Sequence, residues 1–142
     1  MKKLMILPAF IAGIAFSACG QKISAEKVPA SVKTSFAKAY PGASVKWEKE
    51  NGEYEASFKE NGNSMSAMFA PSGTMTESET DIKVNTLPAA ALAYVKKNYP
   101  GKTIKEGAKI TKANGTVNYE ANVSGKDVIF DANGKFLKEV KE

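Results

Sequence analysis

The sequence has no histidine, no arginine and a single cysteine, Cys19, among its 142 residues. Without histidine it cannot form a Ser-His-Asp or Cys-His nucleophile system or an imidazole zinc site. All 20 basic side chains are lysines, which lack the planar fork that arginine offers to phosphate and guanine. A lone cysteine forms no internal disulfide. We therefore expect no enzyme activity, no cofactor, no assignable metal site and no nucleic-acid partner.

The N-terminus has the layout of a secretory signal. Lys2 and Lys3 precede an apolar run over residues 4–16, which is too short to span a bilayer permanently. The segment 16–20 reads Phe-Ser-Ala-Cys-Gly and resembles the lipobox of bacterial lipoproteins, although phenylalanine replaces the usual leucine. We predict a signal peptide over 1–18, a lipid attached to Cys19, a tether over 19–24, and a location in the periplasm or at the outer membrane. Cleavage after Gly20, which would give a soluble periplasmic or secreted protein, is the alternative.

The rest of the chain contains an internal sequence repeat. Val28-Pro29 and Leu87-Pro88 open two segments, and Tyr-Pro-Gly closes each of them at 40–42 and 99–101. Apolar residues recur every fourth position between these marks, which predicts two helices with buried stripes. The pattern indicates a duplication, with repeat 1 at about 25–81 and repeat 2 at about 84–142.

After each predicted helix the apolar period changes from about four to two, with turn residues between the runs. The expected strands are 45–49, 54–58, 65–69 and one from about 74 in the first repeat, and 104–110, 117–123, 126–131 and 135–140 in the second. The connections are too short for parallel crossovers. We therefore predict an α+β fold, a tandem repeat of one helix followed by an antiparallel meander of about four strands, with the helices on one face of the sheet.

These punctuation residues, together with the terminal 130–135 hairpin, resemble the PepSY-like, β-lactamase-inhibitor-like (BLIP-like) domains of exported bacterial proteins. The resemblance covers residues 25–142. It implies a tandem helix-plus-sheet architecture and a noncatalytic role, and it carries over no active-site residue.

One constellation of charged residues stands out. A two-residue Asn51-Gly52 turn pairs Glu50 with Glu53 and Glu48 with Glu55, so that all four carboxylates point to one side of the hairpin. Trp47, Tyr54 and Ala56 then point to the other side, toward the core. The carboxylates form an ordinary solvated face, a docking face for a basic partner, or a face for a hard cation such as calcium.

We expect a noncatalytic binding module of the cell envelope that recognises a protein or peptide. Inhibition of an exported hydrolase is one form that this recognition could take. The alternative is a structural or stress-related envelope lipoprotein with weak polyvalent contacts and no single enzyme partner. In both cases the lipid anchor at Cys19 would attach the chain to the membrane.

Overall fold

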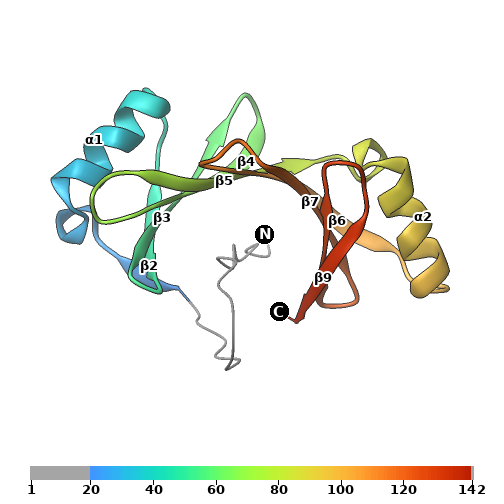
Figure 1. Ribbon diagram of the computed structural model, residues 1–142. Coiled ribbons are helices and arrows are strands. Elements are labelled where there is room, and N and C mark those ends of the chain that lie inside the picture. The colour runs from blue at the N-terminus through green and yellow to red at the C-terminus, as the bar shows by residue number, and fades with distance from the viewer. Residues whose placement is uncertain (1–19, 142) are drawn as a thin grey trace.

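A computed structural model of the protein describes residues 20–141, which form one nine-stranded antiparallel sheet and two short α-helices (Figure 1). The order of the strands in the sheet follows their order in the chain. The first elements are β1 (Gln21–Ile23), the 3-10 helix η1 (Ala25–Lys27), α1 (Ala30–Ala39), β2 (Lys46–Glu50), β3 (Glu53–Glu60), β4 (Asn63–Phe69) and β5 (Met75–Ile82). They are followed by the 3-10 helix η2 (Val84–Thr86), α2 (Ala89–Asn98), β6 (Ile104–Lys112), β7 (Val117–Val123), β8 (Lys126–Asp131) and β9 (Phe136–Lys141).

Proline sets both ends of each α-helix. Pro29 and Pro88 directly precede α1 and α2, where a residue without an N–H leaves no donor unsatisfied. At the other end of α1 the Tyr40 N–H donates to the Phe36 carbonyl at 2.8 Å, and Pro41 follows. Because proline cannot continue the ladder of hydrogen bonds, the helix stops after ten residues.

Each helix covers its own cluster of apolar side chains, and both helices lie on the outer side of the arched sheet (Figure 1). Under α1 the buried residues are Val28, Val32, Phe36, Trp47, Tyr54, Ala56, Phe58, Ala67 and Phe69. Under α2 they are Leu87, Ala91, Val95, Ala121, Val123, Val128 and Phe130. The predicted burial of the helical stripes and of Trp47 is confirmed.

The turns after β4 and β8 pack directly against the helices. An added Cβ at Gly73 would lie 2.7 Å from the Ser31 carbonyl oxygen, and one at Gly134 would lie 2.8 Å from the Ala91 nitrogen. Both glycines have positive φ, +92° and +83°. Two features therefore require glycine at each position: the left-handed backbone conformation and the close approach of the helix.

The expected fold class, a tandem repeat of helix-plus-meander units, is wrong for residues 20–141. They form one continuous sheet with only two short helices, because β5 pairs with β6 along six residue pairs from Glu77↔Lys112 to Ile82↔Gly107. An unpaired edge would leave a row of backbone N–H and C=O groups without partners, and this pairing satisfies them. Periodicity locates strands along a chain, but it does not report which strands pair across an intervening helix.

The predicted signal peptide, residues 1–18, and Cys19 lie outside the described residues. Gln21–Ile23, which falls within the predicted tether, forms strand β1 and pairs with β2. No helix between residues 20 and 141 is both long and apolar enough to cross a membrane.

Candidate functional site: the helix-free face of the sheet

The acidic hairpin forms with the predicted register. Glu48 pairs with Glu55 and Glu50 with Glu53 across a turn in which Asn51 and Gly52 have φ of +48° and +84°. The four side chains point away from the helices. Glu50 and Glu55 are only 3% and 5% exposed, so the hairpin is not simply a solvated surface.

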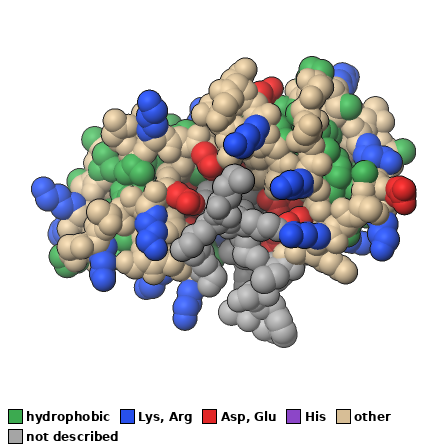
Figure 2. Space-filling view, turned by 180° about the vertical axis from the view of Figure 1, so that it is seen from behind, with side chains coloured by type: hydrophobic (Ala, Val, Ile, Leu, Met, Phe, Trp, Pro, Cys, Tyr) green, Lys and Arg blue, Asp and Glu red, His purple; other side chains and the backbone are tan. Residues whose placement is uncertain are grey.

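The sheet extends this acidic surface far beyond the hairpin. The register pairs Glu55 with Met68 and Met68 with Glu77, which brings the β5 carboxylates onto the same face. We call this surface the helix-free face. Its acidic residues are Glu48, Glu50, Glu53, Glu55, Glu77, Glu79, Asp81, Glu106, Glu120, Asp127 and Asp131. In Figure 2 several acidic side chains lie near the middle of the molecule, and lysines lie both beside them and toward the two ends.

Sequence reasoning missed the β5 and β7 carboxylates. The alternation Glu77, Glu79, Asp81 was visible as a period of two, which places all three on one face of a strand. Their proximity to the hairpin depends on the pairing of β3, β4 and β5, which no local pattern specifies.

Glu79 is the most enclosed of these acids. Its side chain is 2% exposed, and its Oε2 has no hydrogen-bond partner within the part of the chain that the structure describes. Burial raises its pKa well above the usual value, and the nearby carboxylates of Glu120, Asp81, Glu77 and Glu55 raise it further. A buried carboxylate oxygen without a donor is costly when the group is ionised, so Glu79 favours its protonated form unless a cation is present.

Glu50 repeats this situation at the edge of the face. Neither of its carboxylate oxygens has a hydrogen-bond partner among residues 20–141. Burial, and then the charge of Glu48, raise its pKa. On the helix-free face both carboxylate oxygens of Glu50 and Oε2 of Glu79 are therefore buried without a donor in the part of the chain that the structure describes.

Apolar side chains are interspersed among the acids. Met68, Ala108, Ile110 and Ile129 are 1%, 0%, 7% and 6% exposed, and none belongs to the two clusters under the helices. Beside them the buried Asn122 side chain donates to Asp127 at 2.9 Å. On this face the acids are thus accompanied by apolar side chains that are themselves buried.

A metal centre is not formed on this face. Among residues 20–141 no three histidine, cysteine, aspartate or glutamate side chains lie close enough together to hold a metal ion. Calcium takes six to eight oxygen ligands at about 2.3–2.6 Å, so the hard-cation hypothesis for Glu48, Glu50, Glu53 and Glu55 gains no support from this geometry.

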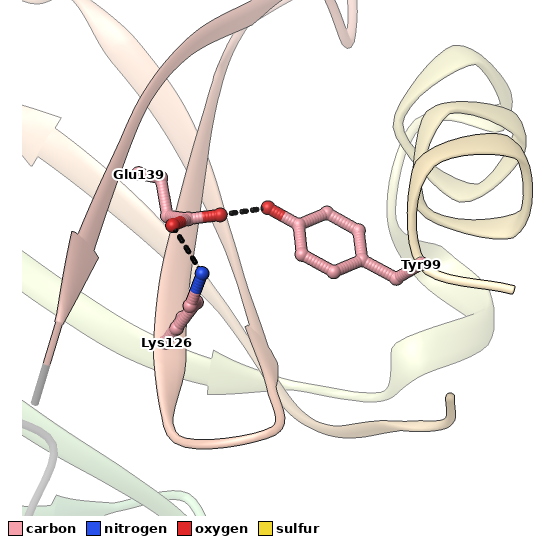
Figure 3. Close-up of polar contacts among 3 residues, drawn as sticks. All are labelled: Tyr99, Lys126 and Glu139. Carbon is pink, nitrogen blue, oxygen red and sulfur yellow. Dashed lines mark hydrogen bonds and ion pairs between the residues drawn. The ribbon is translucent and has the colours of Figure 1, made fainter. Parts of the chain in front are cut away.

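A different polar cluster lies on the helix-covered side and holds the last strand. Glu139 accepts hydrogen bonds from the Tyr99 hydroxyl and from Lys126 Nζ, the latter at 2.6 Å (Figure 3). The Lys126 and Tyr99 hydrogen bonds lower the pKa of Glu139, while burial and Glu139 raise the pKa of Tyr99 to about 12. The cluster joins the end of α2 to β8 and β9, and we interpret it as structural.

The architecture and the acidic face together define an antiparallel-sheet protein with helices on one side and a charged, partly apolar surface on the other. A family described as "Putative beta-lactamase-inhibitor-like, PepSY-like" matches residues 17–76 and 52–138. These matches span most of the sequence, and the chain belongs to this PepSY-like family. The family resemblance seen in the sequence is confirmed.

Solved structures from Bacteroides share the fold. A protein of Bacteroides eggerthii described as "putative periplasmic" has a TM-score of 0.73 at 20% identity, over 80% of this chain and 88% of that chain. A BLIP-like protein of Bacteroides fragilis has a TM-score of 0.65 at 24% identity, over 80% and 86%. A DUF2874 family protein of Bacteroides ovatus has a TM-score of 0.70 at 22% identity, over 80% and 86%. No curated protein matches the chain.

Proposed function

We propose that this chain is an exported, noncatalytic binding module of the cell envelope that recognises a protein or peptide through its helix-free face. The observation that carries the proposal is a set of buried carboxylate oxygens on that face, both of Glu50 and Oε2 of Glu79, which have no hydrogen-bond partner among residues 20–141. They lie beside the buried apolar side chains Met68, Ile110 and Ile129. A partner that supplies donors and apolar groups would offset this desolvation cost.

Export and anchoring are part of the same proposal. The leader over 1–18, the lipobox-like segment ending in Cys19, and the periplasmic description of the Bacteroides eggerthii protein support it. A lipid on Cys19 would leave only Gly20 before β1 begins at Gln21. An ideal Cβ at Gly20 would lie 2.8 Å from Glu48 Oε2, so the anchor would attach beside the helix-free face and hold it close to the membrane surface.

Membership of the β-lactamase-inhibitor-like family makes inhibition of an exported hydrolase one form that this recognition would take. Fold and family do not name the hydrolase, since binding sites vary independently of the scaffold. The acidic face would favour a target whose docking surface is basic.

Site-specific photocrosslinking in living cells tests the proposal. A photoreactive amino acid at Ser66, on the helix-free face opposite Glu79, reports on partners that dock there. The same amino acid at Lys33, exposed on α1, is the matched control.

One discrete crosslinked product at Ser66 and none at Lys33 is the expected result. Diffuse crosslinking at both positions would instead favour the structural envelope protein with weak polyvalent contacts. Hydrolysis of a model peptide by the purified protein, lost on mutation of this face, would contradict the noncatalytic role.

A further inference from the structure

Met75 is the methionine that the fold leaves most open to solvent among residues 20–141. Its side chain, at the start of β5, is 37% exposed, whereas that of Met68 is 1% exposed. Met65 is partly buried against the cluster under α1. An oxidant must reach a sulfur atom to react with it, so an exposed thioether reacts before a buried one. The fold therefore singles out Met75 for oxidation.

A tyrosine hydroxyl lies beside this sulfur. Tyr40, directly after α1, donates a hydrogen bond from its hydroxyl to Met75 Sδ at 3.7 Å. Burial and then the charge of Glu60 raise the pKa of Tyr40, and a hydrogen bond with Ser78 has a smaller, lowering effect. The hydroxyl thus keeps its proton near neutral pH and remains a donor. A thioether is a weak acceptor, so the bond to Met75 contributes little to stability as it stands.

The second half of the chain makes the corresponding link with a stronger acceptor. Tyr99 occupies the place of Tyr40 in the second Tyr-Pro-Gly segment, and its hydroxyl donates to the Glu139 carboxylate. In both halves the tyrosine after the helix is therefore bound to the last strand of its own half, β5 or β9. Hydrogen bonds to a carboxylate are stronger than those to sulfur. The Tyr40 link is the weaker of the two, and an oxygen atom on Met75 would strengthen it.

We propose that Met75 is a reversible oxidation site whose sulfoxide strengthens the hydrogen bond from Tyr40, and with it the link between the end of α1 and β5. The oxidant is hydrogen peroxide. A sulfur lone pair attacks one peroxide oxygen, and the S–O bond forms as the O–O bond breaks. The departing hydroxide takes the proton from the transferred oxygen and leaves as water. Sulfur is oxidised by two electrons and the peroxide is reduced by two.

The position of the donor suits a sulfoxide oxygen. An oxygen bonded to Sδ on the side of Tyr40 shortens the donor–acceptor distance from 3.7 Å toward the range typical of O–H···O bonds, about 2.5–3.0 Å. The turn between β4 and β5 is already held against α1, because the Ser31 hydroxyl donates to the Pro71 carbonyl at 2.8 Å. Oxidation of a packed methionine disrupts a core, but Met75 is exposed. Oxidation is therefore expected to stabilise the protein.

This inference is independent of the proposed function. Met75 pairs with Phe69, a member of the apolar cluster under α1, and so belongs to the helix-covered side of the sheet. Docking of a partner on the helix-free face neither requires nor prevents its oxidation.

Peptide mapping locates the site. Protein purified from the bacterial envelope is treated with hydrogen peroxide and cleaved with trypsin, which releases Met65, Met68 and Met75 in one peptide, residues 60–83. Fragment ions then report which sulfur carries the oxygen. We expect Met75 to be oxidised at least about tenfold faster than Met68, in keeping with their exposures. Oxidation of Met65 or Met68 before Met75 would overturn the site.

Thermal melting tests the role of Tyr40. Oxidation is expected to raise the Tm of the wild type by at least about 2 °C, because a weak hydrogen bond becomes a strong one. Tyr40→Phe keeps the ring and removes the donor, and Met75→Leu removes the sulfur. Neither variant should gain stability on treatment with peroxide. Methionine sulfoxide reductases should return the wild-type Tm to its starting value.

A wild-type Tm that falls or stays the same on oxidation of Met75 would refute the stabilising link. An equal rise in Tyr40→Phe or in Met75→Leu would also refute it, since the effect would then come from another group. If Tyr40→Phe does not fold, the comparison of wild type with Met75→Leu and the peptide map decide the outcome.

Discussion

Replacing Phe36 by alanine is the most direct test of how the first half of the sheet is held. Phe36 is 4% exposed and lies at the centre of an aromatic cluster under α1. Its ring centroid is 5.1 Å from that of Phe58, 5.4 Å from Trp47 and 5.6 Å from Tyr40. The Phe58 and Trp47 contacts are edge-on, the arrangement that aromatic rings favour.

The expected loss is large because the cavity cannot collapse. Truncation of a buried phenylalanine costs about 3–5 kcal/mol, from the lost transfer free energy and from the void that remains. The three flanking rings belong to Trp47 on β2, Phe58 on β3 and Tyr40 directly after α1, so relaxation into the void is restricted. In a domain of this size the loss corresponds to a fall in Tm of roughly 10–20 °C.

Urea denaturation followed by tryptophan fluorescence measures this loss. Trp47 is the only tryptophan in the sequence and contacts Phe36, so it reports the local packing directly. Lys38→Ala, at an exposed position on the same helix, is the matched control and should change the free energy of unfolding by less than about 0.5 kcal/mol. A loss below about 1 kcal/mol for Phe36→Ala, or equal losses for both variants, would show that α1 does not cover the sheet through this residue.

The apolar cluster under α2 should unfold together with the one under α1, because one sheet joins them. Val95→Ala, in the cluster under α2, is therefore expected to lower the urea midpoint reported by Trp47. An unchanged midpoint would show that the two halves unfold separately. Gly134→Ala should cost about 1–3 kcal/mol in the same assay, because the new Cβ meets the Ala91 nitrogen at a positive φ. Glu79→Gln should stabilise the protein above pH 5. The pKa of Glu79 is raised in the folded state, so the free energy of unfolding of the wild type falls as pH rises from the ordinary pKa of 4.5 through the folded pKa. A difference in free energy of unfolding between the two proteins that stays constant from pH 4 to pH 8 would contradict this. Cys19→Ser should move the protein from the membrane fraction or stall its processing, and wild-type protein that is soluble and starts at Gln21 would refute the anchor.

The net charge of the chain and the charge of its helix-free face have opposite signs. The chain carries a net charge of +5, yet its helix-free face is acidic. Net charge therefore gives the wrong sign for the surface proposed to bind a partner. Alternation within β5 and β7 sends carboxylates to one face of the sheet, and the total charge of the chain does not record that separation.

Local features were readable from the sequence because the residues that determine them are adjacent. Proline and Tyr-Pro-Gly bounded both helices, and the Asn51-Gly52 turn fixed the register that pairs Glu48 with Glu55. Strands β7 and β8 occupy the predicted ranges Val117–Val123 and Lys126–Asp131. In each case a backbone preference or a side-chain period of a few residues is sufficient.

The pairing of β5 with β6 was decided only by the tertiary structure, and with it the single sheet and the acidic centre around Ala108. These strands are separated in the chain by η2 and α2, so their register reflects which edges meet after both helices have packed. The burial of Glu79 follows from the same contacts, because Glu55, Glu77 and Glu120 reach it from different strands. A single sequence specifies the charge and period of each strand, but the environment of a carboxylate depends on neighbours that only the folded sheet brings together.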